Sequence, residues 1–75
     1  MDEKFKQLIS EALEIELNTI QGDIVLDPEG NWDSVAILST ISEIDNQYGI
    51  QLDGNELASC RKISEIDALI NKSLI

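Results

Sequence analysis

Apolar residues recur at helical spacing along much of the chain. A stripe with the i, i+3, i+4, i+7, i+8 pattern predicts a first helix over residues 2–17. Its members are Phe5, Leu8, Ile9, Ala12 and Leu13. Apolar positions at three- and four-residue intervals predict a second helix over residues 34–48. These positions are Val35, Leu38, Ile41, Ile44 and Tyr48. Alternation of apolar and polar residues is missing, so no strand is predicted.

Capping residues mark the ends of the later helices. Asp33 or Ser34 is a suitable N-cap for the second helix, and Gly49 is a suitable residue just past its end. Asp53-Gly54-Asn55-Glu56 resembles a capping box, which predicts a short third helix ending near Cys60. A last helix is predicted to begin at an N-cap on Ser64.

A long connection over residues 18–33 separates the first two helices. It contains two turn-forming stretches, 21–23 and 27–31, on either side of the apolar residues Ile24, Val25 and Leu26. We expect these three residues to pack against the core. An ordered connection of this length is often functional.

These elements predict an all-α fold, a four-helix bundle with a short third helix and a long loop between helices one and two. Seventy-five residues allow one core, so residues 1–75 are expected to form a single domain. The predicted buried residues are Phe5, Leu8, Ile9, Leu13, Leu38, Ile41, Ile44, Leu57, Ile63, Ile66, Leu69 and Ile70.

The charge is strongly one-sided, with a formal net charge of −10. No basic residue occurs from Gln7 to Cys60, whereas eleven acids do. Such a surface repels nucleic acid and anionic membranes and attracts basic patches on partner proteins. Solubility alone is the competing explanation.

The N-terminal residues do not resemble a secretory signal, and no apolar run is long enough to span a bilayer. We therefore expect a cytoplasmic protein that does not insert into membranes. The single cysteine, Cys60, excludes an internal disulfide and is expected to pack as a small apolar residue.

Metal binding and self-contained catalysis are not expected. Asp27, Glu29, Asn31 and Asp33 alternate as in a calcium loop, but the EF-hand glycine and the bidentate glutamate are replaced by tryptophan and leucine. The chain has no histidine to act as a base or zinc ligand. A protein of this size also has little room for an enclosed substrate pocket, so we predict that it is not an enzyme.

Ser34 is the residue with the clearest chemical potential. A hydroxyl in the first turn of a helix is exposed and lies beside backbone N–H groups that favour a phosphate. Ser34 is therefore either an ordinary helix-start residue or the attachment point of a phosphate-linked group. Its position alone does not decide between the two.

The chain resembles the acyl carrier protein family over nearly its whole length. The family's Asp-Ser-Leu attachment motif corresponds to Asp33-Ser34-Val35, and Tyr48-Gly49-Ile50-Gln51-Leu52 is similar to its exit from the second helix. The stretch from Ile63 to Ile70 is similar to its closing helix. The triplet by itself is weak evidence. Its combination with length, acidity and element order is specific.

The resemblance implies a covalent 4′-phosphopantetheine cofactor on Ser34, added by a phosphopantetheinyl transferase. The thiol of the arm would carry acyl groups as thioesters to acyl-transferring or acyl-activating enzymes. By the same resemblance Asp33 caps the helix and positions the transferase's Mg²⁺, and Val35 begins the partner-binding face. The acids expected to contact basic partner patches are Glu43, Asp45, Asp53 and Glu56. For each acid singly, a solvated surface is an equally good explanation.

Departures from the family pattern indicate a specialised, stand-alone carrier rather than a housekeeping protein of fatty acid synthesis. A monomer is expected by default. Val35 replaces leucine, the second helix carries few acids, and Cys60 lies where an aliphatic residue is usual. One alternative is an aminoacyl or peptidyl carrier of a nonribosomal-type pathway, which the strong acidity disfavours. The other is an unmodified acidic helical adaptor, in which Ser34 only starts a helix.

Overall fold

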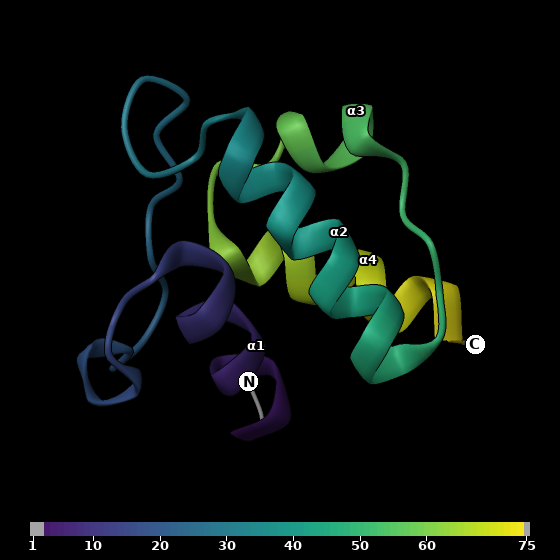
Figure 1. The fold of residues 1–75 in the computed structure, drawn as a ribbon, viewed down its shortest axis with the longest axis horizontal. Helices are drawn as coiled ribbons and strands as arrows, with labels where there is room; N and C mark the ends of the chain where they lie inside the picture. The colour runs from purple at the N-terminus through teal and green to yellow at the C-terminus, as the bar shows by residue number, and fades with distance from the viewer. Residues whose placement is uncertain (1–2, 75) are drawn as a thin grey trace.

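The computed structural model describes residues 3–74, which form a bundle of four α-helices and one short 3₁₀ helix (Figure 1). The elements are α1 (Glu3–Leu13), η1 (Leu17–Thr19), α2 (Ser34–Tyr48), α3 (Gly54–Ala58) and α4 (Ile63–Leu74). The predicted all-α fold with a short third helix and a long connection after the first helix is confirmed.

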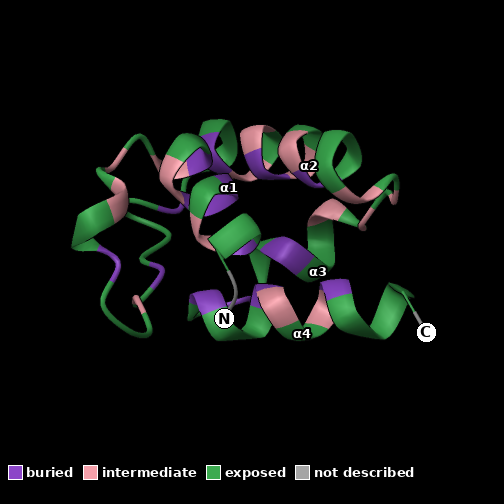
Figure 2. Ribbon diagram, turned by 90° about the horizontal axis from the view of Figure 1, so that it is seen from below, coloured by how far each residue is buried: buried purple, intermediate pink, exposed green. Residues whose placement is uncertain are grey.

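One core lies between the helices. Seen from below, α1 and α2 lie on one side of it and α4 on the other, with α3 between (Figure 2). Cys60 is buried, as expected for a cysteine packed as a small apolar residue. Eight of the residues predicted to be buried are confirmed: Phe5, Leu8, Ile9, Ile44, Leu57, Ile63, Ile66 and Ile70.

The prediction for Leu38 is wrong, because its side chain is 65% exposed. Leu38 follows the exposed Val35 by three residues and therefore lies on the same solvent side of α2. Leu13, Ile41 and Leu69 are only half-buried and pack at the edge of the core. The apolar arc of α2 is thus wider than the face that the core covers.

The helix α1 ends at Leu13, four residues before its predicted end. Glu14 adopts a left-handed conformation with φ of 57°, and the N–H of Ile15 donates to the carbonyl of Ser10 at 3.0 Å. This closes the helix in the manner of a C-terminal cap, although the residue is not glycine. The predicted start at residue 2 lies outside the described residues.

The two left-handed positions make a matched pair for a stability test. Gly49 ends α2 with φ of 69°, and an added Cβ there would meet no atom within 4 Å. Gly49→Ala should therefore lower the free energy of unfolding by strain alone, about 1–2 kcal/mol. Glu14→Gly should raise the free energy of unfolding by up to about 1 kcal/mol, because glycine adopts the left-handed conformation without strain. The gain is limited because glycine also has more conformational entropy in the unfolded chain. Urea denaturation measures the change in the free energy of unfolding for each variant. Changes of the same sign in the two variants would contradict this explanation.

The long connection is held by hydrogen bonds to the start of α4 and to the residues just before it. Leu26 donates to the carbonyl of Arg61 at 2.8 Å, and Ile63 donates to the carbonyl of Ile24 at 3.0 Å. Leu26 is buried and Ile24 half-buried, as expected. Val25 is instead 69% exposed, since it forms an isolated antiparallel bridge with Lys62 and its neighbours on both sides face the core.

The start of α4 differs from the prediction. The helix begins at Ile63, so Ser64 lies in its first turn and is not the N-cap. Asp23 from the connection accepts hydrogen bonds from the backbone N–H of Ser64 at 3.1 Å and from its hydroxyl at 2.7 Å. These bonds lower the pKa of Asp23 below its ordinary value. A residue remote in sequence thus performs the capping.

The short helix α3 has the predicted cap. Asp53 accepts from the backbone N–H of Asn55 at 2.8 Å, although a capping box would use the N–H of Glu56. The helix ends at Ala58 with Ser59 as its C-cap, close to Cys60 as predicted, and the hydroxyl of Ser59 donates to the carbonyl of Glu56 at 2.8 Å.

Candidate functional site

Asp33 fixes the start of α2. Its Oδ1 accepts the N–H of Ala36 at 2.9 Å, and its own backbone carbonyl accepts the N–H of Ile37 at 3.0 Å. Asp33 is therefore the N-cap, which settles the choice between Asp33 and Ser34. Ser34 becomes the first residue of the helix, with an exposed side chain.

Trp32 anchors the residues just before this start. It is 1% exposed, and its indole Nε1–H donates to the carbonyl of Leu57 in α3 at 2.8 Å. The backbone N–H of Trp32 donates to the carbonyl of Asp27 at 2.9 Å. The position of Ser34 is thus tied to both α3 and the long connection.

The first turn of α2 presents unpaired backbone donors. Among the described residues, the N–H groups of Ser34 and Val35 make no hydrogen bond, as expected for the first positions of a helix. In this 15-residue helix they lie at the positive end of the aligned peptide dipoles. A phosphate bonded to the Ser34 hydroxyl would find favourable donors there.

An exposed apolar strip runs down α2 from the site. It consists of Val35, 69% exposed, and Leu38, 65% exposed. Asp45 is exposed and lies two turns beyond Leu38 on the same side of the helix. The sequence analysis assigned Leu38 to the core, although it expected Val35 on the partner-binding face. The spacing of three residues between Val35 and Leu38 indicates that both lie on this exposed side.

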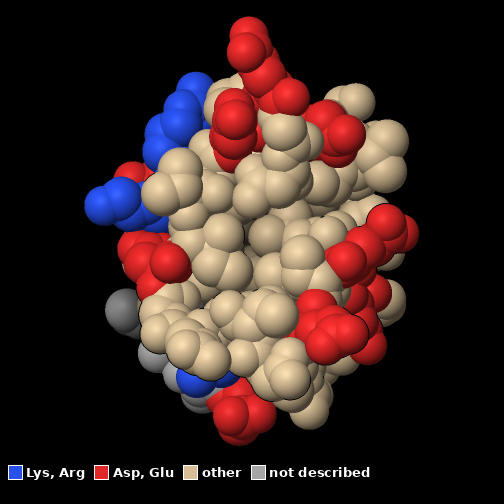
Figure 3. Space-filling view, turned by 90° about the vertical axis from the view of Figure 1, so that its left-hand side faces the viewer, with Lys and Arg blue, Asp and Glu red and all other residues tan. Residues whose placement is uncertain are grey.

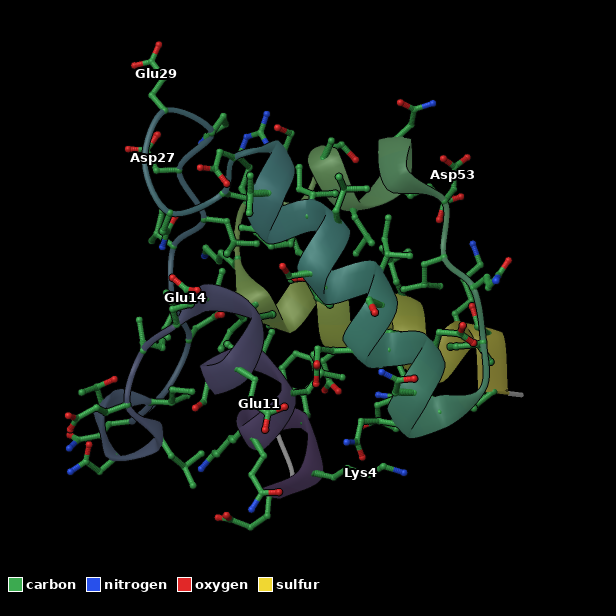
Figure 4. The ribbon with its side chains drawn as sticks, viewed as in Figure 1. Lys4, Glu11, Glu14, Asp27, Glu29 and Asp53 are labelled. Atoms are coloured by element: carbon green, nitrogen blue, oxygen red, sulfur yellow. The ribbon has the colours of Figure 1, made fainter. Side chains whose placement is uncertain are left out.

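The remaining predicted acids lie in two places. Asp53 and Glu56 are both exposed on α3, and Asp53 points away from the body of the molecule (Figure 4). Glu43 is half-buried on the α1 side of α2 and pairs with Glu11 of α1. The structure therefore does not bring Glu43 together with the other predicted partner-binding acids.

The pair Glu11–Glu43 raises the pKa of Glu43 above its ordinary value. The main cause is a hydrogen bond between the two carboxyl groups, because this bond requires a proton on one of them. Burial and the repulsion between the two negative charges raise the pKa further. Because the folded pKa exceeds the unfolded one, the pair stabilises the fold at pH values below the unfolded pKa. This contribution is lost as the pH rises through the folded pKa.

Glu43→Gln should consequently raise the stability at pH 7, where two carboxylates repel each other. For an exposed pair the gain is about 0.2–0.5 kcal/mol. Glu16→Gln is the control, because it removes the same charge beyond the end of α1. Urea denaturation at pH 7 and pH 4 should show an advantage of the Glu43 variant that shrinks or reverses at pH 4. Equal behaviour of the two variants at both pH values would contradict the pairing.

The polar side chains of the connecting loop stabilise its turn by accepting backbone hydrogen bonds. Asp27 accepts the N–H of Glu29 at 3.0 Å, and the amide oxygen of Asn31 accepts the N–H of Asp27 at 2.8 Å. Glu29 extends from the tip of this loop (Figure 4).

Within residues 3–74, no group of three or more histidine, cysteine or acidic residues could hold a metal ion. No helix of the same residues is long and apolar enough to cross a membrane.

The sequence profile described as "Phosphopantetheine attachment site" matches residues 3–70. The chain belongs to this carrier family. The match spans all four helices except the last residues of α4. Comparisons with curated proteins and with solved structures give no match.

Carrier domains of this family hold a covalently attached 4′-phosphopantetheine, which is therefore the cofactor of this chain. They act together with a phosphopantetheinyl transferase and with enzymes that handle the group bound to the arm. The first turn of α2 fits the group, since an exposed hydroxyl and two unpaired N–H donors occur side by side there.

Trp32 is the residue next to the site whose burial the sequence analysis did not predict. Its position just before the N-cap is that of a hydrophobic-staple residue, which packs toward the helix it precedes. That pattern would have indicated a buried tryptophan at the site.

Proposed function

We propose that Ser34 is the residue that bears the phosphopantetheine arm and that this chain is an acyl carrier protein. The observation that supports this best is the exposed hydroxyl at the first position of α2, beside the unpaired N–H groups. Two other serine hydroxyls are engaged: that of Ser59 donates to the carbonyl of Glu56 and that of Ser64 to the carboxylate of Asp23.

The loading reaction is a phosphoryl-group transfer from coenzyme A by a separate transferase. The Ser34 hydroxyl oxygen forms a bond to the phosphorus next to pantetheine, and the pyrophosphate bond breaks. The nucleotide bisphosphate leaves, and the hydroxyl proton passes to a base of the transferase. The chain supplies the nucleophile and the surface, so we propose a carrier and not an enzyme.

The negative charge of the chain supports the proposal that its partners are acyl-handling enzymes with basic patches. The chain has a net charge of −10, and Figure 3 shows acidic side chains around an uncharged centre on the face that carries the long connection, with basic side chains at the upper left and the lower edge. Long-range attraction to a basic partner speeds encounter and weakens with salt. Val35 supplies the apolar contact nearest Ser34, with Asp45, Asp53 and Glu56 as charged contacts and Glu43 as a contact on the α1 side. The same acidity favours acyl over aminoacyl or peptidyl cargo.

Intact mass after incubation with a phosphopantetheinyl transferase and coenzyme A tests the attachment. The expected gain is roughly 340 Da for one arm. Ser34→Ala should abolish the gain, whereas Ser42→Ala, an exposed serine on the same helix, should leave it unchanged. No gain with several transferases, or an equal gain in Ser34→Ala, would refute the proposal.

A further inference from the structure

A groove of about 200 Å³ opens directly beside Ser34, on the α1 side of α2. Both chain neighbours of Ser34, Asp33 and Val35, line it, although Ser34 itself does not, so a group bonded to Ser34 reaches the groove over its rim. The groove exists because α1 stops at Leu13 and the left-handed Glu14 turns the chain away. Figure 4 shows Glu14 beyond this end, next to the connecting loop.

The lining combines an apolar floor with acceptor groups. Leu13, Ala36 and Val35 contribute the apolar surface. Asp33 and Ser39 contribute oxygen atoms, and within the described residues no hydrogen bond uses the Oδ2 of Asp33 or the hydroxyl of Ser39. The carboxylate of Glu14 is likewise without a hydrogen bond in that part of the chain. The groove thus offers acceptors around a small apolar surface.

We propose that this groove binds the pantoyl part of the phosphopantetheine arm, which rests on the proposed attachment at Ser34. That part has two geminal methyl groups, a hydroxyl and an amide N–H, and it follows the phosphate directly. The methyl groups match the floor formed by Leu13 and Ala36. The hydroxyl and N–H donors match the oxygen atoms of Asp33, Glu14 and Ser39.

The size of the groove selects this occupant over the cargo. At about 30 Å³ for each water-sized group, the space holds roughly six or seven such groups. Pockets that enclose whole small-molecule ligands are larger, about 300–1,000 Å³. A long acyl chain therefore does not fit, whereas the dimethyl carbon of the pantoyl part and the hydroxyl-bearing carbon next to it do. The inner half of the arm lies along α1, and the thiol end extends beyond the groove.

Nuclear Overhauser spectra of the holo protein test this placement, after intact mass has shown that the arm is present. We expect cross-peaks from the geminal methyl groups to the methyl groups of Leu13 and Ala36. Cross-peaks to Leu52 and Leu57 near α3 instead, or none to the protein, would overturn the placement and leave the attachment intact. Absence of the arm in the mass spectrum would overturn both proposals.

A pair of serine variants sharpens the test. Ser39→Leu fills the groove and should abolish the cross-peaks to Leu13 and Ala36. Ser42→Leu lies one turn further along α2, outside the groove, and should retain them. Retention of the cross-peaks in loaded Ser39→Leu would contradict the proposed groove.

Discussion

Trp32→Ala should lower the free energy of unfolding by about 3–5 kcal/mol, the range for truncating a fully buried aromatic residue. The loss has two sources. The indole is 1% exposed and its removal leaves a cavity beside Leu57, and its N–H no longer donates to the carbonyl of that residue. A chain of this size has a total stability of only about 4–11 kcal/mol. The alanine variant should therefore lose a large share of its stability, measured by circular dichroism as a lower midpoint of urea denaturation.

Trp32→Phe separates packing from hydrogen bonding. It keeps most of the ring and removes the N–H donor. The carbonyl of Leu57 still accepts the N–H of Cys60 at 3.0 Å, so it is not left unpaired. We expect a cost of about 0.5–1.5 kcal/mol for the lost bond, plus a smaller packing cost. A phenylalanine variant as unstable as the alanine variant would show that the hydrogen bond, not the buried ring, dominates.

Asp33→Ala should reduce both stability and loading of the arm. The stability cost is about 0.5–2 kcal/mol, because the N–H of Ala36 loses its side-chain acceptor. The loading rate should fall further, by about 10- to 100-fold, if the carboxylate orients the Mg²⁺ of the transferase during the reaction. Loading is measured as the rate of appearance of the holo mass at fixed transferase concentration.

Asp33→Asn is the matched control for the two roles of this side chain. Its amide oxygen can still accept the N–H of Ala36, so stability should be close to that of the unchanged protein. The missing charge should leave loading as slow as in Asp33→Ala. Full recovery of the loading rate in the asparagine variant would assign Asp33 to capping alone.

The periodic pattern of the sequence predicted the helices well because their apolar stripes face one core. It predicted α2 from Ser34 to Tyr48, the cap at its start and Gly49 at its end. The place of Ser34 at the start of this helix was predicted as well, whereas its proposed role as attachment residue came from the resemblance to the carrier family. Its place at a helix start follows from local chemistry that does not depend on tertiary contacts.

Features that depend on contacts between distant residues escaped the sequence. Asp23 caps α4 from 41 positions away, which made Ser64 the mistaken choice. The early end of α1 rests on a left-handed glutamate, which residue preferences disfavour. Leu38 looked like core because the pattern does not reveal how much of α2 its neighbours cover. Of these features, the early end of α1 contributes to the groove beside Ser34, which Leu13 and Glu14 help to line.

Fragmentation mass spectrometry of the protein isolated from its own cells tests the central claim most directly, since it reports the attachment residue and the cargo together. The account predicts an arm of roughly 340 Da on the peptide that contains Ser34, in part of the sample extended by a thioester-bound acyl group. An unmodified Ser34 throughout, or an arm on another residue, would contradict it.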